Sequence, residues 1–121
     1  MQDIIRIFDS FCHFFDGVIA SFLVNFNGRT EITVNLYCRD FDNVRRLISL
    51  RFIEVQAWSF LASRHESSEV ITEGIRFKFE NDEWYFDFGD DPDVDLNEQD
   101  WTKMTTKWII AKGIEFNECL N

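Results

Sequence analysis

The chain has 121 residues, of which 45% are hydrophobic and 17% aromatic, and its formal net charge is −10. This length suits a single domain over residues 1–121, and the composition, with one proline and no serine- or glycine-rich run, excludes a disordered chain. The negative charge disfavours nucleic acid as a direct partner, because the phosphates would be repelled.

The N-terminal segment has the periodicity of an amphipathic helix. The apolar side chains that recur at helical spacing are Ile4, Ile5, Phe8, Phe11, Cys12 and Phe15. Polar residues occupy the other face, and Gly17 is placed to end the helix. The phenylalanine-rich stripe predicts that this helix docks on a sheet. A membrane-surface helix is disfavoured, because its polar face is acidic and anionic lipids attract basic faces.

The same segment bears on localisation. Charged residues interrupt it at short intervals, so it lacks the basic start and the unbroken apolar run of a signal peptide. No apolar run in the chain approaches the length of a membrane span. We therefore expect a cytoplasmic protein without a membrane segment. Cys12, Cys38 and Cys119 form no CxxC pair and are expected to be buried, reduced thiols.

A β-hairpin is predicted about Asn27-Gly28, with strands over 18–26 and 30–38. Alternation in the second strand places four apolar side chains on one face: Ile32, Val34, Leu36 and Cys38. The polar break at 39–43 could start a short helical turn, with Phe41, Val44 and Leu47 facing inward. A strand follows over 48–55, and residues 57–61 either continue it past a bulge or pair back on it.

A second hairpin is predicted about Asn81-Asp82, between strands over 74–80 and 84–88. Alternation places Trp84, Phe86 and Phe88 toward the core and Tyr85 and Asp87 on an exposed face. Residues 89–100 are expected to form an exposed, mobile loop. For residues 101–112 both helix and strand fit, and we favour a strand from about Thr105, broken at Gly113, with a final edge segment over 114–116.

These elements predict an α+β fold: mainly antiparallel β-sheet built from hairpins, with an N-terminal amphipathic helix. One segment, between Lys78 and Lys103, holds ten acids and no base: Glu80, Asp82, Glu83, Asp87, Asp90, Asp91, Asp93, Asp95, Glu98 and Asp100. The chain has 22 acids and 12 bases, so this segment accounts for the whole net charge of −10. Trp84, Tyr85 and Trp101 lie among the acids, and an acidic surface with aromatic side chains suits a basic partner.

Signals for catalysis and for metal binding are weaker. His13 and His65 could serve a small hydrolase or nuclease, but acidic surroundings oppose nucleic acid. Asp91, Asp93 and Asp95 have the alternation of a calcium loop, which would make a calcium-regulated interaction domain. However, the glycine and glutamate that such a loop needs are replaced by Leu96 and Thr102. We expect a binding protein with no catalytic residue, metal or cofactor.

Three stretches carry a resemblance to a known class of protein. They are FFDGVIASF running through Asn27-Gly28 into TEITVNLYC, the strand ISLRFIEVQAW, and the acidic, aromatic second half. Together they resemble the small acidic immunity proteins of bacterial polymorphic-toxin and contact-dependent growth inhibition systems. The resemblance covers most of the chain.

This resemblance implies a protein that binds one cognate toxin domain and occludes its active site. Such toxins are often nucleases with basic surfaces, so acidic side chains would take the place of phosphates. The charged residues expected to contact the toxin are Asp82, Glu83, Asp87, Asp90, Asp91, Asp93 and Asp95. Tyr85 and Trp101 are the expected aromatic anchors.

Overall fold

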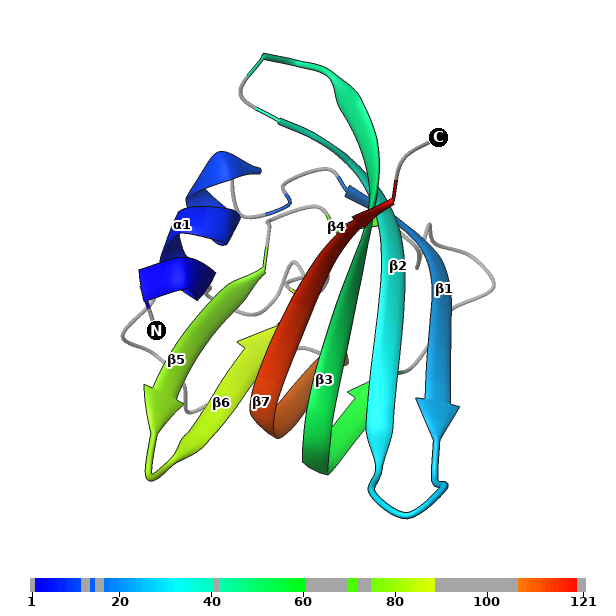
Figure 1. The fold of residues 1–121 in the computed structure, drawn as a ribbon, viewed down its shortest axis with the longest axis vertical. Helices are drawn as coiled ribbons and strands as arrows, with labels where there is room; N and C mark the ends of the chain where they lie inside the picture. Colours follow the sequence, from blue (N-terminus) through cyan, green and yellow to red (C-terminus); the bar gives the residue numbers. More distant parts are fainter. Residues whose placement is uncertain are drawn as a thin grey trace.

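The computed structural model describes residues 2–11, 14, 17–40, 42–60, 70–71, 75–88 and 107–119. Within these ranges the elements are α1 (Gln2–Ser10), β1 (Gly17–Asn25), β2 (Glu31–Arg39), β3 (Arg45–Phe60), β4 (Val70–Ile71), β5 (Arg76–Glu80), β6 (Glu83–Asp87) and β7 (Lys107–Cys119). The fold is mainly antiparallel β-sheet with one short N-terminal helix, as predicted (Figure 1). In the described part of the chain, no helix is long and apolar enough to cross a membrane.

All seven strands form one sheet in the order β4-β1-β2-β3-β7-β6-β5. The last strand, β7, therefore lies between β3 and β6 and pairs antiparallel with both. The predicted break at Gly113 is wrong. Gly113 is paired with Ile53 inside a continuous strand, and residues 114–116 continue it along β3, beyond the end of the ladder with β6.

The sheet folds over on itself where β3 and β7 bend together. The ladder between them shifts register between Val55 and Ala57, and Glu54 has a left-handed φ of 51°. Such a bulge bends a strand and increases its twist. Figure 1 shows both strands turning back at the lower end of the molecule. The first half of β3 thus pairs with β2, whereas the first half of β7 pairs with β6.

The core fills the space between the two layers, and α1 closes its open side. The inward-facing side chains of β2, β3 and β6 confirm the predicted alternation: Ile32, Val34, Leu36, Cys38, Ile48, Leu50, Phe52, Trp84 and Phe86 are buried. Phe8 of α1 packs its ring 4.7 Å from that of Phe77 and 6.1 Å from that of Phe86. Burial of such a side chain contributes about 1.5–3 kcal/mol to folding.

The helix is shorter than predicted. It ends at Ser10, and Ile5, expected inside, is 45% exposed. Gly17 does not end the helix but begins β1. A Cβ at Gly17 would lie 2.9 Å from the carbonyl oxygen of Phe14, so the glycine is required by the close approach of two backbones.

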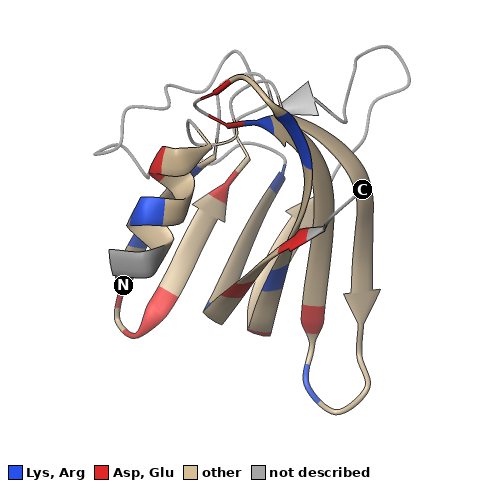
Figure 2. Ribbon diagram, turned by 45° about the horizontal axis from the view of Figure 1, so that its top comes forward, with Lys and Arg blue, Asp and Glu red and all other residues tan. Residues whose placement is uncertain are grey.

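The β2–β3 connection also differs from its prediction. No helical turn forms in its described residues. Instead, Arg39 pairs with Arg45 across the ladder and the chain turns between them. Val44, expected inside, is 46% exposed, and Leu47 lies in β3 opposite Tyr37. The turn therefore projects from the upper end of the sheet as a charged hairpin (Figure 2).

Candidate functional site

The predicted partner-binding residues fall into two groups. Asp82, Glu83, Tyr85 and Asp87 belong to the β5–β6 hairpin. Asp90, Asp91, Asp93, Asp95 and Trp101 lie outside the described residues, as do His13 and His65. The structure therefore tests the position of the first group only. Within that group, Asp87 lies at the root of the hairpin, and the other three residues lie at or near its tip.

The tip of the hairpin is acidic. We call Glu80, Asn81, Asp82 and Glu83 the acidic tip. Asn81 and Asp82 have φ values of 55° and 62°, as a tight two-residue hairpin turn requires. Glu80 and Glu83 are cross-strand partners, so two carboxylates flank the turn. Asp82 is exposed, and it makes no ion pair within the part of the chain that the structure describes.

Lysines partly offset the flanking carboxylates. Lys78 Nζ lies 2.9 Å from Glu80 Oε2, and Lys112 Nζ lies 4.0 Å from Glu83 Oε1. Both ion pairs are partly exposed, and such pairs contribute only about 0–1 kcal/mol. A net negative charge therefore remains at the acidic tip, centred on Asp82.

The charge at the acidic tip is not needed to form the turn. Like charges directly opposite each other in a ladder are destabilising, although Glu80 and Glu83 are each paired with a lysine. Aspartate tolerates the left-handed region but less well than glycine. The turn therefore does not require the charge of Asp82, which is available to a partner.

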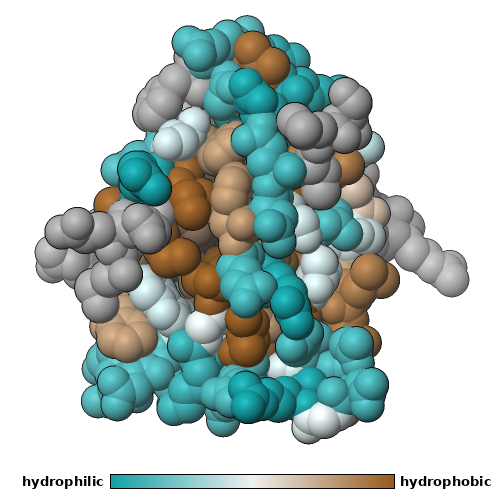
Figure 3. All heavy atoms as spheres, in the orientation of Figure 1, coloured by the Kyte–Doolittle hydropathy of each residue, from teal (hydrophilic) through white to brown (hydrophobic). Residues whose placement is uncertain are grey.

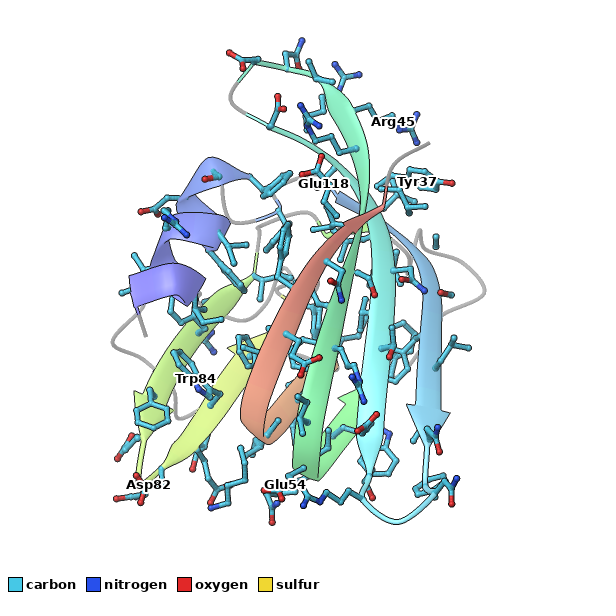
Figure 4. All side chains as sticks on the ribbon, viewed as in Figure 1. Tyr37, Arg45, Glu54, Asp82, Trp84 and Glu118 are labelled. Carbon is cyan, nitrogen blue, oxygen red and sulfur yellow. The ribbon has the colours of Figure 1, made fainter. Side chains whose placement is uncertain are left out.

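The acidic tip shares its end of the molecule with other turns (Figures 1 and 4). Arg29 in the β1–β2 loop pairs with Glu54 at the bend of β3, with 2.9 Å between Nη1 and Oε1. The amide of Val55 donates to the carbonyl of Thr30 at 2.9 Å, which ties the bend to the same loop. In Figure 3 the lower edge of the molecule is accordingly mostly hydrophilic.

An exposed aromatic pair also lies at this end, and the sequence analysis did not single it out. Phe26, which follows β1, is 66% exposed, and its ring lies 5.9 Å from that of Trp58. The sequence analysis placed Phe26 at the end of the strand predicted over 18–26, whereas β1 ends at Asn25. Its neighbour Trp58 comes from the segment beyond the bulge, so only the bend of β3 brings the two together.

Tyr85 lies on the same face of the hairpin as Glu83, and its side chain is half-buried. Lys78 Nζ lies 4.7 Å above its ring, a cation–π contact that holds both side chains on the outer face of β5 and β6. Tyr85 therefore presents part of its ring beside the acidic tip.

Asp87 corrects the sequence analysis, which placed it on the exposed contact face. Its exposure is 0%, and Arg76 Nη2 donates to its Oδ2 at 3.1 Å with both side chains buried. Lys107 is also buried, with Nζ 5.4 Å from the ring centre of Phe60. Strand alternation predicts which face of the sheet a side chain lies on, but not how deeply it is buried. Asp87 lies on the same face as Tyr85, yet it is buried because that face is covered at the root of the hairpin. Asp87 therefore has a structural role.

The described residues show no sign of metal or thiol chemistry. Nowhere among them do three His, Cys, Asp or Glu side chains gather in a way that could hold a metal ion. Cys38 is a free, buried thiol, as predicted. Its burial, and secondarily the carboxylates of Asp40 and Glu118, raise its pKa to about 12. The thiol is therefore protonated at neutral pH and is a poor nucleophile.

Comparisons with models of protein families, with curated proteins and with solved structures returned no match to this chain.

Proposed function

We propose that this protein is a binding module whose acidic tip contacts a basic surface of a partner protein. The observation that supports this most directly is the exposed turn of Asp82, flanked by the opposed carboxylates of Glu80 and Glu83. The acidic segment of the sequence begins at this turn and continues beyond β6. A partner would therefore meet a concentration of negative charge around the hairpin.

The proposed partner is a cognate bacterial toxin domain, which makes this chain an immunity protein. This part of the proposal rests on the resemblance of its sequence to small acidic immunity proteins. A nuclease-type toxin binds phosphates with basic side chains, and carboxylates at the acidic tip would occupy the same positions. Neutralisation would then be occlusion of the toxin's active site, with no catalysis by the immunity protein.

Charge and apolar contact have separate parts in this mechanism. Complementary charges accelerate association, and the effect falls with ionic strength. Aromatic side chains at the centre of an interface slow dissociation. Tyr85 lies beside the acidic tip and can supply such a contact, and the exposed pair Phe26 and Trp58 lies at the same end of the molecule.

The test begins with the partner. Tagged protein is used to capture binding proteins from its own organism, which are released by rising salt and identified by mass spectrometry. Association and dissociation rates are then measured for the wild type and for Asp82→Lys. We expect Asp82→Lys to reduce the association rate about tenfold at low salt and to flatten its salt dependence.

Asp42→Lys is the matched control. Asp42 is also an exposed aspartate in a hairpin turn, but it lies at the opposite end of the molecule. Both variants change the net charge equally, so a long-range effect of charge would appear in both. A partner that is not basic, or that binds Asp82→Lys as fast as Asp42→Lys, contradicts the proposal.

A further inference from the structure

The tip of the β2–β3 hairpin carries an arrangement that the acidic partner-binding role does not use. We call Arg39, Asn43 and Arg45, with Tyr37 beneath them, the basic tip. Arg39 and Arg45 are cross-strand partners, so both side chains leave the same face of the ladder at the base of the turn. Figure 4 places Arg45 and Tyr37 at the end of the molecule opposite Asp82 and Glu54.

These two arginines differ from most of the others in the described chain. Four other arginines form ion pairs: Arg29 with Glu54, Arg46 with Asp40 and Glu118, Arg51 with Glu31 and Glu115, and Arg76 with Asp87. Over the same described residues, neither Arg39 nor Arg45 pairs with a carboxylate. This is unexpected in a chain with 22 acids and 12 bases.

Neutral groups orient the two guanidiniums instead. Arg39 Nη1 donates to Asn43 Oδ1 at 3.0 Å, and the guanidinium of Arg45 lies 5.0 Å from the centre of the Tyr37 ring. Both contacts hold the planar groups in place without neutralising their charge. An opposed pair of like charges is destabilising in the free protein, and an anion between them would relieve it.

Side-chain hydrogen bonds join the described residues of the turn that carries this pair. The carboxylate of Asp40 accepts hydrogen bonds from the amides of Asp42 at 2.9 Å and Val44 at 3.0 Å. Arg46 Nε donates to the other oxygen of Asp40 at 2.6 Å. A ligand would therefore meet a turn that these contacts already shape, which lowers the entropic cost of binding.

We propose that the basic tip binds a carboxylate-bearing segment of a partner protein. Arginine presents a planar set of donors that matches a carboxylate, and two arginines on one face can each pair with an acidic side chain of the same segment. Val44, which is 46% exposed at the same turn, offers an apolar contact next to them. This surface is separate from the acidic tip in position and in sign, and it would allow this protein to bind a second chain.

Nucleic acid fits the tip less well than an acidic protein segment. A phosphate would suit the two guanidiniums, but a nucleic acid is a continuous polyanion and would extend from the small tip over a chain of net charge −10. A short peptide segment touches only the tip. Acids at the far end of the molecule are then screened, because the Debye length is about 8 Å at physiological salt.

The experiment is an NMR titration of the full chain with a synthetic glutamate-rich peptide at physiological salt, where the distant acids are screened. We expect the amide shifts to centre on Tyr37, Arg39 and Arg45. In the double variant Arg39→Gln with Arg45→Gln, we expect the affinity for this peptide to fall about tenfold. Arg29→Gln is the matched control, because Arg29 also lies in a hairpin loop but is paired with Glu54, and it should leave the affinity unchanged.

Two further measurements make the result decisive. Lysine at both positions keeps the charge but loses the planar fork, so its affinity should lie between those of the wild type and the glutamine variant. The glutamine variant loses the contacts with Asn43 and Tyr37, so its own NMR spectrum is recorded first. The variant should give the spectrum of a folded protein, and its lower affinity then reports the loss of the two guanidiniums.

Three binding results would overturn the proposal. The first is peptide shifts spread over the whole surface, and the second is equal affinity in the glutamine variant. The third is tighter binding of an oligothymidylate of the same charge at the same salt, which would assign the basic tip to nucleic acid.

Discussion

The β2–β3 and β5–β6 hairpins both end in a turn where like-charged side chains oppose each other across the ladder. Arg39 opposes Arg45 in one hairpin, and Glu80 opposes Glu83 in the other. Each turn also contains a left-handed residue that is not glycine, Asn43 or Asp82, both with a φ of 62°. The two turns thus share a local design and carry opposite charge.

The hairpins differ in how their turns are held. The basic tip is fixed by the hydrogen bonds of Asp40, whereas the acidic tip depends on two adjacent left-handed residues and has no equivalent side chain. The bent sheet places them at opposite ends of the longest axis (Figures 2 and 4). This separation keeps charges of opposite sign from neutralising each other, so each turn can meet a different partner.

The largest change in the free energy of unfolding is expected at the root of the β5–β6 hairpin, and it is compared with a change at the tip. Asp87→Ala leaves Arg76 without its buried carboxylate partner, so we expect the free energy of unfolding to fall by about 3–5 kcal/mol. Asp82→Asn removes an exposed charge and keeps a residue type that tolerates the left-handed conformation, so it should change the free energy of unfolding by less than about 0.5 kcal/mol. Urea unfolding of both variants measures the difference, and equal stabilities would remove the distinction between root and tip.

A smaller effect of opposite sign is expected at the acidic tip. Asp82→Gly relieves the left-handed conformation, so we expect the free energy of unfolding to rise by about 1 kcal/mol. The same change removes the central carboxylate and should weaken binding of a basic partner. Thermal unfolding checks the first expectation. A less stable Asp82→Gly variant would show that the aspartate supports the turn after all.

The smallest effect is local and concerns the basic tip. The guanidinium of Arg46, followed by the amide of Val44, holds the pKa of Asp40 below its ordinary value. The pKa of Asp40 is lower in the folded state than in the unfolded state. Its contribution to the free energy of unfolding is therefore complete above the ordinary aspartate pKa of about 3.9 and is lost as the pH falls below it. In an NMR pH titration, the amide of Val44 should therefore shift only below that value.

The control for this titration is Asp40→Asn, in which the amide of Val44 should no longer follow this titration. A midpoint at or above the ordinary aspartate pKa in the wild type would contradict the hydrogen bonds of Asp40 in the turn. The contacts that shape the basic tip would then be absent.

Sequence reasoning succeeded where a side chain's position follows from its neighbours along the chain. Strict alternation identified Ile32, Val34 and Leu36 as core, because successive side chains of a strand point to opposite faces. Asn81 and Asp82 were recognised as a turn, because both residue types tolerate a positive φ. The acidic segment itself is a property of composition and needed no fold.

The tertiary structure decided what depends on contacts between distant parts of the chain. Asp87 shares a face with Tyr85 yet is buried, because its depth depends on where β6 lies in the sheet. The insertion of β7 between β3 and β6 was likewise beyond any local pattern. The like-charged residues that face each other at the two turns could not be identified as cross-strand partners from the sequence. Arg39 and Arg45, for example, are only known there to be six positions apart. The sequence alone determined the strands and their inward faces, since these follow from local periodicity. Strand order and burial depth were decided by the pairing of strands that lie far apart in the chain, and the bend at Glu54 folded the paired β3 and β7 back on themselves.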